Sequence, residues 1–310
     1  MALSVLDGPV HVRAPGKLNL FFEVGARQDD GYHDVASVYQ AVSLYEEVWA
    51  TPAADFSVSV SGTVDVSTVP EDDRNLALRA ARAVAKRLKT GEGVHLDIVK
   101  HVPVAGGMGG GSADAAAALV ACDALWDGGL GAAELHRLAT RLGADVPFAL
   151  MGGAAVGTGR GDRLSPALAR ARFDWVLAVD DGGLSTPAVY GRLDELRDQD
   201  APDIAPQPRG PEVEPVVLQA LRCGDPELLA HGVRNDLQAA ALSMRPELGD
   251  LLAAGERAGA LAGLVSGSGP TTAFLAGDPE HALELQVGLS ASGYAALHVH
   301  GPVRGAHVVG

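Results

Sequence analysis

The glycine-rich segment from Gly106 to Ser112 has the residue types of an anion-binding loop. Five of its seven residues are glycine, and it lies between an apolar stretch ending near Val99 and an alanine-rich helical pattern. A backbone without Cβ atoms can fold closely around a ligand, and its N–H groups, with the positive end of a following helix, attract negative charge. The segment therefore predicts a phosphate-binding site.

Two common nucleotide-binding patterns do not fit this segment. No lysine precedes Ser112, as a P-loop requires, and the glycine spacing is not that of a dinucleotide-binding domain. The cation must therefore come from elsewhere in the chain. The plainer alternative is a flexible turn, in which Ser112 and Asp114 only cap the helix and add a favourable charge to its first turn.

Lys17 and Asn19 lie where two apolar, strand-like stretches meet, and alternation along a strand points both side chains to the same face. A lysine in this position can neutralise a phosphoryl oxygen or stabilise a substrate alkoxide as it forms. For an isolated lysine, a solvated place on an edge strand is the simpler interpretation. A chemical role for Lys17 is favoured only when the other segments are considered with it.

Asp145 lies between a helical pattern that ends at Gly143 and Pro147, a residue typical of helix starts. One interpretation makes Asp145 a plain N-cap. The other makes it a catalytic carboxylate that orients a substrate hydroxyl and accepts its proton, while Lys17 beside it keeps it ionised. A further glycine turn, from Ser266 to Ala273, either approaches the phosphates or forms a simple hairpin.

Strand-like and helical patterns are mixed along the chain, which predicts the α+β class. The expected strands are Val10 to Ala14, Leu18 to Val24, Val35 to Leu44, Phe56 to Val60, Val94 to Val99, Trp175 to Val179, Ala260 to Val265, Thr272 to Leu275 and Ala295 to His300. The expected helices are Asn75 to Leu88, Ala113 to Trp126, Ala132 to Leu142, Val216 to Arg222, Glu247 to Ala258 and Pro279 to Leu289.

We expect two domains, because 310 residues are too many for one comfortable core. The glycine-rich stretch from Gly152 to Gly161 places the boundary near residue 160. Residues 1–160 would hold the glycine loop and the catalytic residues, and residues 161–310 would form a split βαβ sandwich. The proline-rich stretch from Asp198 to Pro215 is expected to be an exposed, mobile loop.

The composition narrows the classes of partner and compartment. With 24 basic and 39 acidic residues, the net charge of −15 disfavours nucleic acid and anionic membranes. No stretch has the length and apolarity of a membrane span, and the first thirty residues do not follow a signal-peptide pattern. Cys122 and Cys223, the two cysteines, are far apart, which fits a reducing cytoplasm.

With these segments in hand, the sequence resembles the kinase superfamily of galactokinase, homoserine kinase, mevalonate kinase and phosphomevalonate kinase. The central motif of that superfamily matches Pro103 to Ser112, with Met108 in place of leucine, and the two flanking motifs match Pro15 to Leu20 and Val265 to Phe274. Within the superfamily, Asp29 to His33 and Gly143 to Pro147 are similar to the branch that phosphorylates 4-diphosphocytidyl-2-C-methyl-D-erythritol. The resemblance covers about residues 13 to 275.

The resemblance implies a two-domain small-molecule kinase that uses ATP and Mg²⁺. It would transfer the γ-phosphate directly to the 2-hydroxyl of the cytidylated methylerythritol, a step of non-mevalonate isoprenoid synthesis, with Lys17 and Asp145 as the catalytic pair. Tyr32 would stack on the cytosine, His33 would hydrogen-bond its edge, and Tyr190 would close its other face. Asn19 and Thr186 would also bind this substrate.

The ATP site implied by the resemblance combines the glycine loop with two positions near the adenine. Its expected members are Asn75, Lys100, Pro103, Val104, Ala105, Gly106, Gly107, Met108, Gly109, Gly110, Gly111, Ser112 and Ala113. The Mg²⁺ ligands stay unknown, because Ser112 is a candidate by position alone and no acidic partner is obvious.

Three other functions remain open from the sequence. The nearest is the same chemistry on another alcohol, such as mevalonate or homoserine. A regulatory module that binds ATP without turnover is disfavoured, because it would have no use for the proton acceptor Asp145. A dinucleotide-dependent oxidoreductase is disfavoured, because this chain lacks the glycine spacing of that fold. Whether the protein is a monomer or a homodimer is not determined.

Overall fold

The computed structural model describes residues 8–179, 182–199, 205–206 and 209–310. In the first part of the chain the elements are β1 (Val10–Arg27), β2 (His33–Ala53), β3 (Ser57–Gly62), α1 (Leu76–Leu88), β4 (Gly93–Lys100), α2 (Gly110–Leu125), α3 (Ala132–Leu142), α4 (Val146–Met151), β5 (Ala154–Thr158) and β6 (Arg163–Ala167).

The remaining elements alternate short helices with strands. They are β7 (Phe173–Val179), α5 (Thr186–Asp198), α6 (Pro215–Cys223), α7 (Pro226–Ala230), β8 (Arg234–Asn235), α8 (Gln238–Met244), α9 (Glu247–Arg257), β9 (Ala262–Val265), β10 (Thr272–Ala276), α10 (Pro279–Ala291), β11 (Ala295–Gly301) and β12 (His307–Val308). The expected α+β class is confirmed.

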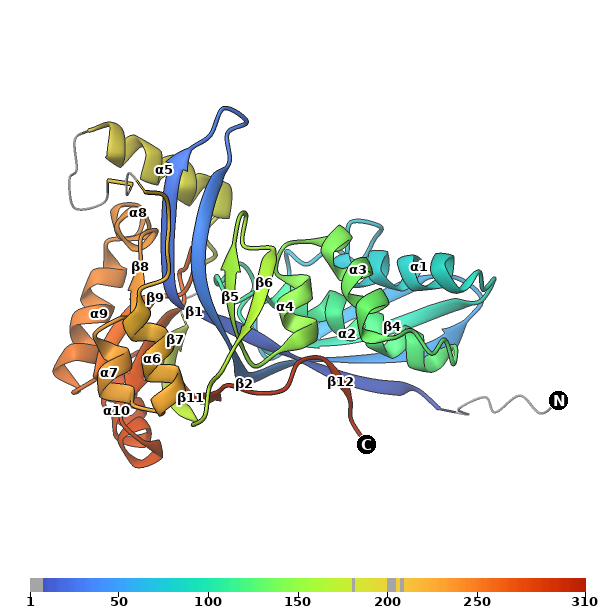
Figure 1. The fold of residues 1–310 in the computed structure, drawn as a ribbon. Coiled ribbons are helices and arrows are strands. Elements are labelled where there is room, and N and C mark those ends of the chain that lie inside the picture. Colours follow the sequence, from blue (N-terminus) through green and yellow to red (C-terminus); the bar gives the residue numbers. More distant parts are fainter. Residues whose placement is uncertain (1–7, 180–181, 200–204, 207–208) are drawn as a thin grey trace.

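The long antiparallel hairpin of β1 and β2 is the spine of the molecule. Its sheet runs in the order β12-β1-β2-β4-β3, and β5, β6 and β8 join it along the other half of the two long strands. Figure 1 shows α1 to α4 on one side of this hairpin and α6 to α10 on the other. The hairpin therefore runs through both halves of the molecule.

A second sheet, in the order β11-β7-β10-β9, is antiparallel throughout. Alternate residues of its strands face opposite cores, as the period of a strand requires. Trp175 and Leu275 pack with β1, β2, α6 and α7, whereas Val176 and Phe274 pack with α8, α9 and α10. The two central strands of this sheet, β7 and β10, are thus buried on both faces.

Helix α2 is the centre of the first core. The alanines from Ala115 to Ala118 are fully buried, and a helix that is apolar on every side is expected to be enclosed by other elements. Their small side chains let α1, β1 and β2 pack closely around the helix. The glycine loop that precedes α2 is therefore anchored to the best-packed part of the fold.

Three expectations about local structure need correction. The two strands expected from Val10 to Val24 are one strand, β1, whose pairing with β2 shifts register between Pro15 and Lys17. Helix α2 begins at Gly110, before the expected start at Ala113, because glycine can adopt helical dihedrals although it favours none. Helix α5 was not expected, since its apolar residues follow no regular helical stripe.

The division of the chain near residue 160 stays a prediction. Strands β6 and β12 both follow that position, yet they pair with the sheet of β1 and β2. In the stretch from Asp198 to Pro215, for which mobility was expected, residues 200–204 and 207–208 lie outside the described residues. Within the described part of the chain, no helix has the length and apolarity to cross a bilayer.

Candidate active site

A cleft of about 1380 Å³ lies between the glycine loop, β1 and the start of α5. A pocket for one small molecule usually measures roughly 300 to 1,000 Å³, so this cleft has room for two phosphorylated ligands. It is lined by most of the residues expected from the sequence, namely Lys17, Asn19, Tyr32, His33, Asn75, Lys100, Pro103, Val104, Ala105, Gly106, Gly107, Gly109, Gly110, Gly111, Ser112, Asp145, Thr186 and Tyr190.

Met108 and Ala113 are the two expected ATP-site residues that do not line the cleft. The side chain of Met108 is fully buried in the core that includes β1 and β2, and that of Ala113 in the core around α2. Their side chains therefore anchor the loop on either side of its exposed backbone.

The backbone of the glycine loop requires glycine at Gly107 and Gly109. Their φ angles are +78° and +73°, in the left-handed region that other residues rarely adopt. A Cβ on Gly107 would also lie 2.0 Å from the carbonyl oxygen of Ser266, in the second glycine turn. That turn joins β9 to β10 as a hairpin, and it packs directly on the first loop.

The first turn of α2 presents its amide groups at the loop. The N–H groups of Ser112 and Ala113 bond to the carbonyl of Gly109, so the amides of Gly110 and Gly111 come before the first bonded turn. Unpaired amides at a helix start form an anion site. The loop therefore has the backbone groups that the expected phosphate cradle requires, and phosphate binding itself stays a prediction.

Lys17 is held against this loop by its own backbone. Its N–H donates to the carbonyl of Met108 at 3.0 Å, and its ammonium donates to the side-chain oxygen of Asn19. Asn19 in turn donates to the hydroxyl of Ser37 at 2.8 Å. A Cβ on Gly267 would lie 3.3 Å from the Lys17 nitrogen, so the second glycine turn also closes on this amine.

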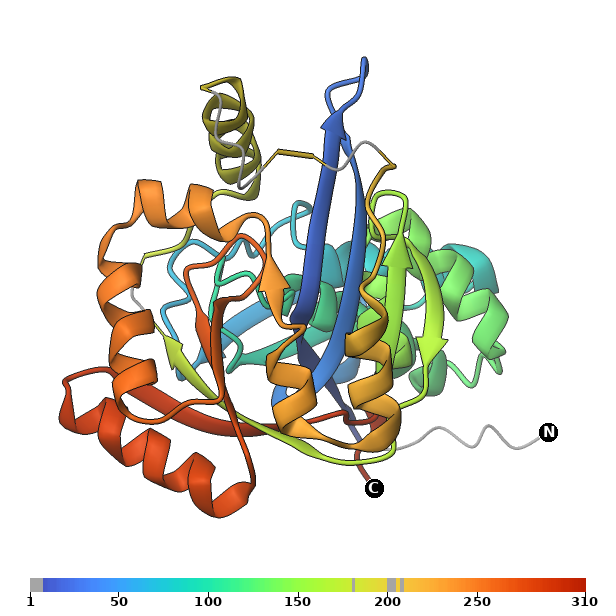
Figure 2. The ribbon, with the colours of Figure 1, turned by 60° about the vertical axis from the view of Figure 1, so that its left-hand side comes forward.

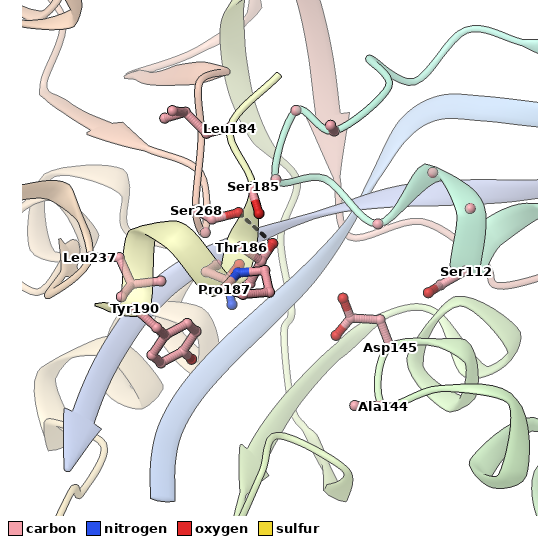
Figure 3. Close-up of a pocket in the computed structure, with 18 of the residues that line it drawn as sticks. Ser112, Ala144, Asp145, Leu184, Ser185, Thr186, Pro187, Tyr190, Leu237 and Ser268 are labelled. Carbon is pink, nitrogen blue, oxygen red and sulfur yellow. Dashed lines mark hydrogen bonds between the residues drawn. The ribbon is translucent and has the colours of Figure 1, made fainter. Parts of the chain in front are cut away.

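Asp145 converges on the same point from the far side of the cleft. A Cβ on Gly109 would be 3.5 Å from Cγ of Lys17 and 3.8 Å from Oδ2 of Asp145. Asp145 occupies the N-cap position of α4, yet within the described residues its side chain makes no capping bond. Figure 3 shows its carboxylate directed into the cleft, which Ser112 also lines. A capping role therefore does not account for the aspartate at position 145.

Burial and charge act in opposite directions on Lys17. Removal from water lowers the pKa of its amine below the ordinary value of 10.5, and the charge of Asp145 raises that pKa in part. The larger effect is burial. The Lys17 amine therefore loses its proton more readily than the amine of a surface lysine. The negative charge of Asp145 offsets part of this effect.

Lys100 lies deeper, in a buried ion cluster. Its ammonium donates to Glu46 at 2.5 Å and to Asp114 at 2.6 Å, and the second oxygen of Glu46 accepts from the backbone of His101. Burial raises the pKa of Glu46 to about 8, and it also raises the pKa of Asp114. This cluster lies beneath Gly110, so it supports the first turn of α2.

Asn75 caps α1 at the opposite end of the cleft. Its side-chain oxygen accepts from the N–H of Ala77 at 2.9 Å, and its amide donates to the carbonyl of Pro70 at 2.7 Å. One N–H of the amide is left over for a ligand, because an Asn side chain carries two. Its expected place near an adenine stays a prediction.

Tyr32 is the exposed ring at the mouth of the cleft. Its side chain is 56% exposed, and the guanidinium of Arg160 lies over the ring, 3.8 Å from the centroid. Arg160 itself is held by the carboxylate of Asp30 at 2.5 Å. One face of Tyr32 is therefore covered, and the other face remains for a flat ligand.

His33 and Tyr190 form the inner part of this mouth. Their ring centroids are 5.2 Å apart, at an angle of 31°, and Nε2 of His33 lies 2.8 Å from a carboxylate oxygen of Asp194. Tyr190 and Asp194 both belong to α5, one turn apart. Thr186, at the start of that helix, shares a hydrogen bond of 2.9 Å with Ser268 (Figure 3).

Sequence reasoning missed Ser37, Glu46, Arg160 and Asp194, whereas Ser268 lies in the second glycine turn that the sequence had singled out. Only Asp194 carried a usable signal, since it follows Tyr190 by four positions and such pairs share a helix face. The other three come from segments whose pairing across the fold is not visible in the sequence.

The site has a plausible donor set for Mg²⁺, although within the described residues no three His, Cys, Asp or Glu side chains are grouped to hold a metal. Mg²⁺ in phosphotransfer sites is usually held by one or two carboxylates together with substrate phosphates. Asp145, which carries a carboxylate, and Ser112, which carries a hydroxyl, both line the cleft (Figure 3). These donors fit the ion.

Family models place this sequence in a known group of enzymes. Residues 75–153 match the N-terminal domain of the GHMP kinases, and residues 217–295 match their C-terminal domain. The chain is 58% identical over 300 residues to the 4-diphosphocytidyl-2-C-methyl-D-erythritol kinase of Clavibacter michiganensis subsp. michiganensis, covering 97% of this chain and 96% of that protein.

The chain belongs to the 4-diphosphocytidyl-2-C-methyl-D-erythritol kinase family. The kinase of the same name from Leifsonia xyli subsp. xyli is 59% identical over 301 residues, covering 97% of this chain and 98% of its relative. A crystal structure of a 4-(cytidine 5'-diphospho)-2C-methyl-D-erythritol kinase superposes with a TM-score of 0.75 at 30% identity, covering 94% of this chain and 98% of that one. The expected resemblance is confirmed.

The wider superfamily shares the architecture of this kinase family. Homoserine kinase from Cytophaga hutchinsonii superposes with a TM-score of 0.74 over the full length of both chains, at 18% identity. Identity this low shows a common fold and leaves the acceptor alcohol open. The acceptor must therefore be argued from the cleft and from the closer relatives.

Proposed function

We propose that this protein transfers the γ-phosphate of ATP to the 2-hydroxyl of 4-diphosphocytidyl-2-C-methyl-D-erythritol. The observation that carries the proposal is the convergence of Lys17 and Asp145 at Gly109, at the edge of the glycine cradle. Relatives named for this reaction, at 58% and 59% identity, support the choice of acceptor. The rival alcohols, mevalonate and homoserine, belong to structures that share only the fold at 18% identity.

The catalytic pair would work mainly by position and charge. Phosphoryl transfer has a loose transition state, so the enzyme gains most from alignment and from compensating the charge on the transferred group. Asp145 would orient the acceptor hydroxyl and take its proton. Lys17 would stabilise the oxygen that attacks and the phosphoryl oxygens that it approaches.

The ATP would lie along the glycine loop, with its phosphates on the amides of Gly110 and Gly111. Asn75 and the segment from Pro103 to Ala105 would form the adenine end of the site. Lys100 was expected beside the adenine; its bonds to Glu46 and Asp114 favour a supporting role under the cradle.

The cytidine diphosphate part of the acceptor would lie at the mouth of the cleft. Tyr32 and Tyr190 would enclose the cytosine, and His33 would hydrogen-bond its edge. Asn19 and Thr186 also line the cleft, and they would hold the methylerythritol unit. Two aromatic faces suit a flat, neutral base.

Mg²⁺ would be held by Asp145 and Ser112 together with the phosphates of ATP. When bound, it supplies positive charge that neutralises the β- and γ-phosphates. Asp145 would then serve both the ion and the acceptor hydroxyl, which makes it the side chain whose loss damages most functions at once.

We further propose that the kinase acts in the cytoplasm on small molecules, as a monomer or a homodimer, without nucleic-acid partners. The net charge of −15 supports the last point, and two widely separated cysteines support a reducing compartment.

The test is turnover with ATP and the cytidylated alcohol. Asp145→Ala should lower kcat by roughly 10² to 10⁴-fold, the usual size of a general-base contribution, while the binding of an ATP analogue measured without Mg²⁺ changes little. Wild-type rates for Asp145→Ala would overturn the assignment. Mevalonate and homoserine, supplied at the same concentration, should give no turnover.

A further inference from the structure

His33 has a carboxylate partner that no part of the proposed reaction uses. Nε2 of His33 lies 2.8 Å from Oδ1 of Asp194, and the two side chains are 4% and 19% exposed. The other oxygen of Asp194 lies 3.8 Å from the guanidinium of Arg27. The His33–Asp194 contact is thus a well-formed bond at the inner wall of the cleft.

The contact fixes which ring nitrogen of His33 carries the proton. A carboxylate accepts hydrogen bonds and donates none, so the nitrogen bonded to it must be the protonated one. In a neutral imidazole the other nitrogen, Nδ1, then has a lone pair and acts only as an acceptor. The same device orients the histidines of metal sites, where a carboxylate sets the tautomer of the ring.

A fixed acceptor at this position can tell cytosine from uracil. Cytosine presents an amino group at C4, a donor, whereas uracil carries a carbonyl oxygen, an acceptor, at the same place. A buried acceptor facing a carbonyl oxygen leaves both groups unpaired, and unpaired buried groups are the strongest source of discrimination between similar ligands.

We propose that Asp194 is the positioning residue for base selectivity: it holds His33 in the tautomer whose Nδ1 accepts from the amino group of cytosine. This inference rests on the proposed function, because it takes the cytidine part of the acceptor as the ligand of His33. Helix α5 then supplies two parts of one site, the ring of Tyr190 and, one turn later, the carboxylate of Asp194.

The test is direct binding of CDP and UDP, measured by calorimetry without turnover. Wild-type protein should prefer CDP. Asp194→Ala should reduce the ratio of CDP to UDP affinity by on the order of tenfold, about the contribution of one hydrogen bond to a buried group. A merely structural effect of the substitution would weaken CDP and UDP equally, and an unchanged ratio would therefore overturn the proposal.

Two further variants separate Asp194 from its surroundings. In a His33→Ala background, Asp194→Ala should cause no additional loss of selectivity, because the carboxylate acts through the ring. Arg192→Gln removes a neighbouring charge of α5 that bonds to Ser243 and Glu195 and is not among the described residues that line the cleft, so it should leave the ratio unchanged. An additive loss in the double variant, or a loss in Arg192→Gln as large as that in Asp194→Ala, would count against positioning through His33.

A measurement on the wild-type protein does not depend on any variant folding. Nitrogen NMR of labelled histidine should show Nε2 of His33 protonated and Nδ1 unprotonated, and CDP should shift the Nδ1 signal. A proton on Nδ1 in the neutral ring would contradict the inference. If the protein prefers CDP through Asp194 but transfers no phosphate, the proposed activity is wrong and this inference stands.

Discussion

The backbone N–H of Lys17 donates a hydrogen bond to the carbonyl oxygen of Met108, at 3.0 Å. This single bond ties the first strand to the middle of the glycine loop. The strand that carries Lys17 and the glycine loop are therefore tied together, with Met108 buried in the core. Movement of the loop would carry the Lys17 amine with it.

The charge of Lys17 should be lost at a lower pH than that of an ordinary lysine. Burial lowers the pKa of the Lys17 amine below 10.5, so kcat/KM should fall on the alkaline side before that value is reached. Asp145→Asn removes the charge that partly restores this pKa, and the amine should then titrate lower still. Carbon NMR of the lysine ε-carbons measures both titrations, and a Lys17 signal that titrates at or above 10.5 would contradict the prediction.

The ring of Tyr32 should contribute to acceptor affinity through its face. Because Arg160 covers one face and the ring is 56% exposed, the other face is available to the base. Tyr32→Ala should raise KM for the cytidylated acceptor by roughly tenfold or more, the usual effect of losing one base stack, with KM for ATP unchanged. Tyr32→Phe keeps the ring and should stay near wild type. Equal damage from both substitutions would point to the hydroxyl instead.

Two glycines of the same loop should respond to alanine in opposite ways. At Gly107 the φ of +78° and the carbonyl of Ser266, 2.0 Å from an added Cβ, predict a clear fall in Tm. Gly111 is helical and an added Cβ meets nothing within 4 Å, so Gly111→Ala should keep or slightly raise Tm. Its KM for ATP should nevertheless rise if phosphate approaches this backbone. Equal melting temperatures for the two variants would refute the steric argument.

The buried cluster around Lys100 should make stability depend on pH. Burial raises the pKa of Glu46 from 4.5 to about 8, so between these values the folded protein holds a proton that the unfolded chain releases. The carboxyl of Glu46 therefore makes its full contribution to the free energy of unfolding at low pH. That contribution is lost as the pH rises through about 8. Glu46→Gln cannot titrate.

Thermal melting between about pH 5 and about pH 8 tests this dependence. The fall in Tm with rising pH should be shallower in Glu46→Gln than in the wild type. Glu284→Gln is a matched control, because Glu284 is exposed on α10, and its pH dependence should follow the wild type. A wild-type slope in Glu46→Gln would show that the carboxyl of Glu46 does not hold the extra proton.

The sequence alone determined the glycine loop in front of the central helix, and it predicted a phosphate cradle there, because this chemistry lies in consecutive residues. Glycines between a strand and a helix can be recognised without partners, and Lys17 and Asp145 stood out by their flanking patterns. The central helix was also predictable, since the alanine run indicates both its helical state and its burial. Even so, the start of α2 was misplaced, because glycine carries no preference that marks a boundary.

Only the tertiary structure decided which distant side chains face each other. The place of Asp194 beside His33, of Arg160 over Tyr32, and of Glu46 beside Lys100 depends on how β4, the loop before β6, and α5 pack around the long hairpin. Such contacts join residues far apart in the chain, and no local pattern encodes them. The physical reason is that the backbone groups of the glycine loop belong to consecutive residues. Two distant side chains come into contact only when packing brings their segments together.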